Sequence, residues 1–307
     1  MKKHFILMIS VMVLFCGAGA ADLPSIAGKT AGMEKMPGYF TMYWDHDAGK
    51  LWMEIDKFDA EFLYVHSLPA GLGSNQIGLD RNQLGGTRIV KFLRAGPKIM
   101  LMQPNYDFRA EEGSPAEKKA VEDAFARSVI WSFPVAAETD GRILIDATPF
   151  LLHDAHRAAQ SLERSSQARY RLDPARSAVY KPNTKNFPQN TEMESLLTFV
   201  SDNPSRLVFR VAPDPGAVTL RQHHSFIQLP EPGYKPRIYD PRSNFSAFSY
   251  MDFMVPVGKS LTQRFIRRHR LAKKDPAAEV SDPVEPIVYY IDPGCPEPIL
   301  TALREGG

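Results

Sequence analysis

Two closely spaced histidines are the first candidates for metal chemistry in this sequence. His153 and His156 are three residues apart, so on a helix they would share a face and could ligate one ion. The zinc-peptidase motif His-Glu-x-x-His spaces its histidines by four and places a general base after the first. Asp154 occupies that position here, and the motif occurs nowhere in the chain. We therefore predict a structural role for His153 and His156.

A second pair, His223 and His224, is adjacent in an expected strand. Neighbouring side chains of a strand point to opposite faces, which makes joint ligation of one ion awkward. We predict one buried and one exposed histidine.

The remaining candidates are incomplete motifs. A glycine-rich dinucleotide or phosphate loop, a calcium loop and a serine nucleophile elbow each lack a required residue. Gly71-Leu72-Gly73 resembles the start of a dinucleotide loop, Gly258-Lys259-Ser260 the end of a phosphate loop, and Asp45-His46-Asp47 the start of a calcium loop. Cys295 is a lone thiol. We predict that this chain holds no catalytic, cofactor-binding or metal-ligating residue and is inactive as an enzyme by itself.

The first 20 residues have the features of a secretory signal peptide. Lys2 and Lys3 precede an apolar run, and Ala18-Gly19-Ala20 offers small residues for cleavage. The run is shorter than the roughly 20 apolar residues of a spanning helix, and the bulky Phe15 before Cys16 argues against a lipoprotein signal. We expect export to the periplasm or the extracellular space, with no membrane association after cleavage.

Charge and cysteine content narrow the partners further. Loss of Lys2 and Lys3 leaves 35 basic and 35 acidic residues, so no net charge attracts nucleic acid or anionic lipid. Cys295 then has no partner for an intramolecular disulfide. A local basic run does stand out: Arg264, Arg267, Arg268, Arg270, Lys273 and Lys274, with His269 inside it. We expect this basic run to form a solvated or inter-domain face that pairs with carboxylates, in preference to binding nucleic acid or lipid.

Most of the expected secondary structure consists of strands. Tyr39–Trp44 and Lys50–Asp56 flank turn residues and predict a hairpin. Further strands are expected at Glu61–Ser67, Thr87–Arg94, Pro97–Gln103, Ile130–Ala136, Arg142–Ala147, Leu196–Val200, Arg206–Ala212, Val218–Leu229 and Ile287–Ile291. The glycine-rich stretch Pro69–Gly86 is expected to be a long, functional or mobile loop.

Helices are fewer in this pattern. Ser114, Pro115 and Glu117 supply a cap, a first-turn proline and a capping box for one helix. A second helix is expected at Leu151–Gln167, and the start of a third at Pro296–Arg304. The predicted fold class is therefore α+β, mainly antiparallel β-sheet with few helices.

Several motifs, none of them catalytic, occur together along nearly the whole mature chain. They are Gln103-Pro104-Asn105-Tyr106, Ala126–Val129 with Phe133-Pro134, Ile145–His156, Ser225–Pro230, Tyr239–Arg242, Arg268–Leu271 with Lys274–Pro276, and Pro286–Pro293. In combination they resemble the domain of unknown function that precedes the catalytic domain of large secreted bacterial zinc-dependent metallopeptidases of metzincin-like type. The resemblance implies that Ile287–Ile291 opens the peptidase domain. The family's zinc ligands and catalytic glutamate have no matching positions here.

These expectations give a domain plan: a signal peptide at 1–20, a β-rich accessory domain at 33–255, a proline-rich, basic connector at 256–285, and the truncated start of a metallopeptidase-like domain at 286–307. The function expected is a non-catalytic N-terminal accessory or pro-region-like part of an exported zinc metallopeptidase-type protein, with the catalytic domain as partner. This chain needs no cofactor of its own, although the full-length family uses zinc. A gene fragment and a natural short form both remain open. The alternative function is a free-standing periplasmic binding or interaction protein using the Pro69–Gly86 loop or the basic run, and a weaker one is an unrecognised hydrolase.

Overall fold

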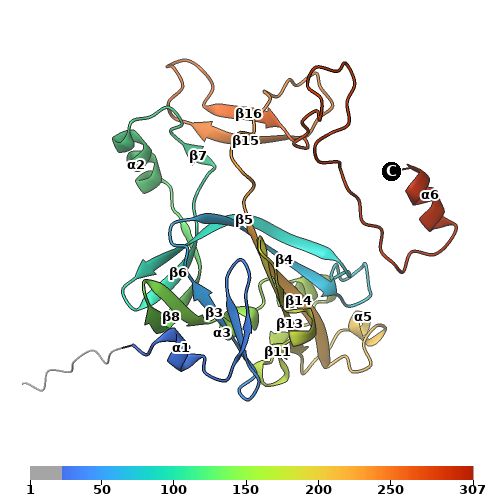
Figure 1. The fold of residues 1–307 in the computed structure, drawn as a ribbon. Helices are drawn as coiled ribbons and strands as arrows, with labels where there is room; N and C mark the ends of the chain where they lie inside the picture. The colour runs from blue at the N-terminus through green and yellow to red at the C-terminus, as the bar shows by residue number, and fades with distance from the viewer. Residues whose placement is uncertain (1–22, 307) are drawn as a thin grey trace, which may run out of the picture. The chain divides into compact units, whose positions relative to one another are not determined.

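The computed structural model describes residues 23–306 and confirms an α+β fold dominated by antiparallel sheet (Figure 1). The expected signal peptide lies outside the described residues. The described chain forms two compact units: residues up to Pro104 together with Ser128–Leu229, and Asn105–Arg127 together with the chain from Pro230. Within the described residues, no helix is both long enough and apolar enough to cross a membrane.

Among the described residues, the first unit is built on one sheet of 13 strands, all of whose pairings are antiparallel. The strands are β1 Glu34–Met36, β2 Met42–Asp45, β3 Lys50–Ile55, β4 Glu61–Ala70, β5 Gln83–Ala95, β6 Lys98–Gln103, β8 Ser128–Thr139, β9 Arg142–Asp146, β10 Arg171–Leu172, β11 Ala178–Val179, β12 Lys185–Asn186, β13 Asn190–Val200 and β14 Ala217–Gln228. The spatial order is β1-β2-β3-β9-β8-β6-β5-β4-β14-β13, and β10, β11 and β12 all lie along the outer edge of β13. The predicted hairpin is confirmed as β2 and β3.

The two ends of this sheet meet at a seam between β1 and β12. The main-chain N–H of Tyr39 donates to the carbonyl of Phe187 at 2.8 Å. The Asn186 amide nitrogen donates to the carbonyls of Met36 at 2.8 Å and Phe40 at 2.7 Å. We call this region, residues 34–40 and 181–187, the β1–β12 seam. The sheet therefore curls until its end strands are joined by a few bonds, most of them from side chains.

The curled sheet encloses two apolar clusters because its strands alternate inward and outward side chains. In the first cluster Phe40, Phe62, Phe92 and Phe226 pack with most ring pairs edge to face, at centroid separations from 5.0 Å. The second cluster lies further along β4, β13 and β14, and its strand members include Leu68, Leu197, Phe199, Val218 and Leu220.

The loop after β4 contributes to the second cluster. Leu72, Ile77 and Leu79 are at most 8% exposed, so the stretch expected to be a long loop is anchored by apolar side chains. The loop is also shorter than predicted because β4 continues to Ala70 and β5 begins at Gln83.

The helices of the first unit are short: α1 Ile26–Lys29, α3 Thr148–Leu151, α4 Ala158–Ser166 and α5 Arg206–Phe209. The single helix predicted over Leu151–Gln167 is wrong, because a break separates α3 from α4 and Arg157 takes a left-handed conformation with φ 57°. The strand predicted at Arg206–Ala212 is also wrong. There Ser205 caps a helical turn through the N–H of Leu207, and Val208 is its one buried residue.

The second unit contains β7 Phe108–Arg109, α2 Pro115–Ala124, β15 Ala247–Asp252, β16 Thr262–Ile266 and α6 Ile299–Gly306. β15 pairs antiparallel with β16 and parallel with β7. The Ser114/Glu117 capping box of α2 is confirmed. The predicted domain boundary at residue 255 falls between β15 and β16, inside this small sheet. The predicted strand Ile287–Ile291 is not formed, and Figure 1 shows irregular chain from β16 to α6.

Candidate functional site

A layer of buried polar side chains separates the two apolar clusters that the curled sheet encloses. Strand alternation turns Tyr64 and His66 of β4 inward, together with Gln222 and His224 of β14. His66 and His224 are directly opposite each other in the β4–β14 register. All four side chains are at most 5% exposed. The break between α3 and α4 adds His153 and His156, so three of the four histidines noted in the sequence reach this layer.

The hydrogen bonds of Gln222 fix the protonation of its neighbours. Its Oε1 accepts from the N–H of His156 at 3.0 Å, so its amide nitrogen is the donor. That nitrogen donates to the carbonyl of His153 at 2.8 Å and to Nε2 of His224 at 3.0 Å. His224 must then carry its proton on Nδ1, which donates to the Tyr64 hydroxyl at 3.0 Å. The buried imidazole of His224 is thus a neutral, fully bonded ring.

His66 and His156 form a second bonded pair, with their Nδ1 atoms 3.2 Å apart. The N–H of Gly86 donates to Nε2 of His66 at 3.3 Å, so the His66 proton lies on Nδ1 and is donated to His156. Nε2 of His156 donates in turn to Gln83 at 3.3 Å. A metal on Nδ1 of His66 would require a proton on Nε2, facing the Gly86 N–H. The contacts therefore fit a neutral hydrogen-bond network better than a pair of metal ligands.

Electrostatics support the neutral state of this layer. Burial, and then the neighbouring His156, lower the pKa of His66 to about 4. Burial also lowers the pKa values of His153 and His156, and that of His224 far below its usual range. Among residues 23–306, no three or more His, Cys, Asp or Glu side chains are grouped so as to hold a metal ion. That His153 and His156 ligate no metal stays a prediction.

The outer face of β13 and β14 carries a charged row. In the β13–β14 register Glu192 is opposite Ser225 and Glu194 is opposite His223. Nε2 of His223 donates to Glu192 at 2.6 Å and its Nδ1 to Glu194 at 3.2 Å. Arg221 approaches Glu194 at 3.3 Å. As predicted, His223 and His224 point to opposite faces. His223 is half-buried, however, because this row covers it.

The two carboxylates decide what His223 can do chemically. Burial alone, the largest influence, would lower its pKa, but hydrogen bonds from the ring to Glu192 and Glu194 raise it to about 9. Burial alone would raise the pKa of Glu192. Its hydrogen bonds with His223, Ser225 and Asn190 outweigh burial and lower that pKa. At neutral pH both ring nitrogens of His223 carry protons, so the ring has no lone pair with which to act as a general base. The row is suited to holding a fixed arrangement of charge.

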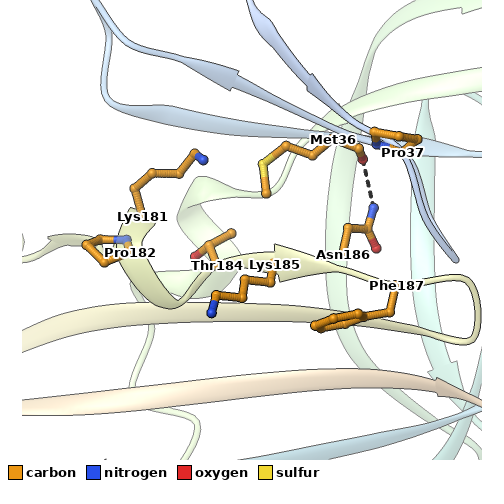
Figure 2. Close-up of a pocket in the computed structure, with 8 residues that line it drawn as sticks. All are labelled: Met36, Pro37, Lys181, Pro182, Thr184, Lys185, Asn186 and Phe187. Carbon is orange, nitrogen blue, oxygen red and sulfur yellow. Dashed lines mark hydrogen bonds between the residues drawn. The ribbon is translucent and has the colours of Figure 1, made fainter.

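Two neighbouring hollows flank β12 and share Lys185 and Phe187. One, of about 370 Å³, is lined by the charged row and by Ser67, Pro69 and Asn183. The other, of about 730 Å³, lies in the β1–β12 seam. Figure 2 shows Met36 and Pro37 on one side of it, and Thr184 and Asn186 on the other, with the Asn186–Met36 hydrogen bond crossing the gap. We call the two hollows together the β12 groove.

Phe187 and Lys185 are the accessible side chains of this groove. Phe187, directly after β12, is 44% exposed. Lys185 is exposed and, within the described part of the chain, pairs with no carboxylate. Lys181 is bound to Glu34 at 2.9 Å. The β12 groove therefore offers an apolar anchor and one lysine that forms no ion pair, although Glu192 is opposite it in the β12–β13 register.

The basic run of the second unit binds main chain. Arg268 donates to the carbonyl of residue 235 at 2.8 Å, Arg270 to those of residues 231 and 232, and Lys273 to those of residues 278 and 279. These three side chains therefore tie irregular segments together, where we had expected pairing with carboxylates. Cys295, in the same unit, is a free thiol.

Sequence reasoning missed the β12 groove because its parts come from distant segments. Met36, for example, had no signal beyond its apolar character. The buried polar layer did have a signal, since Gln222 and His224 interrupt the alternating apolar positions of β14.

Comparison with protein families gave one match. Residues 82–274 match the model of a family described as a domain of unknown function, DUF5117. The match covers more than half of the chain, so the protein belongs to this family. It includes β12 to β14 and both histidine pairs. No curated protein and no solved structure matched.

Proposed function

We propose that this member of the DUF5117 family is the non-catalytic N-terminal accessory part of an exported zinc metallopeptidase-type protein. The observation that carries the proposal is the apolar segment Ile287–Tyr290 of the second unit. Ile287 is 41% exposed, Val288 60%, Tyr289 74% and Tyr290 94%. Contiguous exposed apolar side chains of this kind mark surfaces that another protein covers.

The main chain of this segment supports the same interpretation. Between β16 and α6 the described residues form no strand, and no main-chain hydrogen bond within the described chain involves residues 287–291. A β-branched and aromatic sequence such as Ile-Val-Tyr-Tyr-Ile favours pairing in a sheet. α6 repeats the pattern, with Ile299 54% and Leu303 51% exposed. Both segments need an external sheet or core to pack against.

The catalytic domain is the partner that the sequence motifs favour. The resemblance places Ile287–Ile291 as the first strand of the peptidase domain, so its sheet partners would be supplied by that domain. In this arrangement the first unit serves as a folded scaffold that orients substrate, shields the catalytic cleft or assists folding. The zinc would be held entirely by the catalytic part.

The proposal is tested with the DNA downstream of this reading frame and with hydrogen exchange. We expect the DNA to encode His-Glu-x-x-His, in frame or by frameshift. We also expect the polypeptide it encodes, added to this chain, to slow amide exchange at 287–291. The double variant Tyr289→Ser, Tyr290→Ser should remove this protection. The control Phe245→Ser, at an exposed aromatic of the same unit, should keep it. Absence of the motif, or unchanged exchange, contradicts the proposal.

A further inference from the structure

We infer that the β12 groove binds an extended peptide that carries a carboxylate next to an apolar side chain. This inference concerns the first unit alone and does not depend on the proposed peptidase partner.

The open edges of the β1–β12 seam are the first reason for a peptide. β1 pairs only with β2, and β12 only with β13, so each has an outer edge that no strand of the described chain occupies. Such an edge presents unpaired main-chain groups and is a template for an added strand. The hollow between the edges, about 730 Å³, is within the size range of ligand pockets.

The existing bridges across the seam define the length of the groove. At one end Asn186 donates to the carbonyls of Met36 and Phe40. Near the other end the Lys181–Glu34 ion pair crosses it, with 28% and 45% of the two side chains exposed. Exposed ion pairs contribute little stability, so a ligand carboxylate can replace Glu34 at small cost.

Charge and apolar character define the ligand. The groove's own carboxylates are already bound: Glu192 by His223 and Ser225, and Glu194 by His223 and Arg221. Lys185 is left as a cation available for an incoming carboxylate. Next to it lies Phe187. Together with Met36, Pro37 and Pro182 of the larger hollow, Phe187 offers a surface for an apolar side chain. An acidic, apolar peptide in extended conformation satisfies all of these groups.

A panel of labelled peptides tests the inference. Hexapeptides that alternate glutamate with varied apolar residues, acetylated and amidated at their ends, are titrated with the whole chain and followed by fluorescence anisotropy. The same panel with glutamine for glutamate measures the contribution of the carboxylates. We expect saturable binding to the glutamate panel and about tenfold weaker binding to the glutamine panel, the ratio typical of one partly buried charged hydrogen bond.

Variants locate the binding site. Lys185→Gln should remove the preference for glutamate, whereas Lys98→Gln, at an exposed lysine on the end of β6, should keep it. Phe187→Ala should weaken binding to both panels, whereas Leu84→Ala, which truncates another exposed apolar side chain, should not. Thermal unfolding of each variant checks that it is folded. The inference is overturned if no member of the panel binds, or if binding is unchanged in both Lys185→Gln and Phe187→Ala.

Discussion

The Nδ1 atoms of His66 and His156 lie 3.2 Å apart and join β4 to the segment that precedes α4. The proton between them belongs to His66, because the other nitrogen of that ring accepts from Gly86. This contact, with those of Gln222 and His224, places a neutral polar layer between the two apolar clusters that the curled sheet encloses.

Gly85 should be required for the position of His66. A Cβ at Gly85 would lie 2.0 Å from Cε1 of His66, a buried ring with no room to move. We expect Gly85→Ala to lower the free energy of unfolding by about 1–3 kcal/mol, as overpacking does in other cores. Gly86→Ala is a matched control, since its Cβ would meet the end of Arg88 at 3.6 Å and Nε2 of His66 at 3.9 Å, both ordinary van der Waals contacts. Equal urea-unfolding curves for the two variants would argue against a rigid His66.

Stability should fall on the acid side of pH 6.5. Unfolded His66 binds its proton near its ordinary pKa of 6.5, whereas the folded protein, in which burial and His156 lower that pKa, binds it only near pH 4. Between these values the unfolded state holds more protons, so the free energy of unfolding decreases as the pH falls. The decrease begins above the range in which ordinary carboxylates titrate. Urea unfolding that is unchanged down to about pH 5 would contradict a buried neutral His66.

The charged row should make stability fall on the alkaline side as well. The pKa of His223, raised to about 9, lies above its unfolded value of 6.5. Its contribution is therefore fully present below pH 6.5 and is lost as the pH rises towards 9. We expect His223→Gln to flatten this alkaline decrease. His46→Gln should retain it, because the His46 side chain is 67% exposed and contacts Glu34 and Trp44, not the charged row. The same slope in both variants would show that another group causes the decrease.

Asp154 should matter as a helix cap. Its two carboxylate oxygens accept from the N–H groups of Ala158 at 2.7 Å and Ala159 at 2.9 Å, at the start of α4. Asp154→Ala is expected to cost about 1 kcal/mol, the usual loss for an N-terminal cap. Asp154→Asn keeps one accepting oxygen and should cost less. Asp202→Ala, at an exposed position, serves as the control for urea unfolding, and an Asp154→Ala curve identical to it would refute the capping role.

Deletion of residues 286–307 should leave the thermal stability of the remaining protein nearly unchanged. Ile287, Val288, Tyr289 and Tyr290 are all at least 41% exposed, so their removal uncovers little apolar surface. Calorimetry of the full and shortened chains measures this directly. A large decrease in the melting temperature would mean that this segment is part of a core of its own unit.

The sequence predicted local structure well where signals were short-range. The β2–β3 hairpin and the Ser114 capping box depend on residues close together in the chain, and both formed. The opposite faces of His223 and His224 followed from strand geometry alone. The helix break at Arg157 was missed because the cap by Asp154 outweighed the apolar pattern. The helical turn at Arg206–Phe209 was missed because the cap by Ser205 did the same.

The parts of the site that were not predicted depend on contacts between distant segments. Nothing near His66 in the sequence identifies His156 as its partner, since they are 90 residues apart. The β1–β12 seam joins residues about 150 positions apart through the side chain of Asn186. Such contacts follow from the curl of the whole sheet, which no local pattern specifies.

We predict that this chain by itself is not an active zinc peptidase. The most direct test is a peptidase assay on the purified chain alone, with its zinc content measured in the same sample. We expect no chelator-sensitive cleavage of a denatured protein substrate, and zinc well below one ion per chain. Chelator-sensitive cleavage together with stoichiometric zinc, both lost in His153→Ala or His156→Ala, would contradict this prediction.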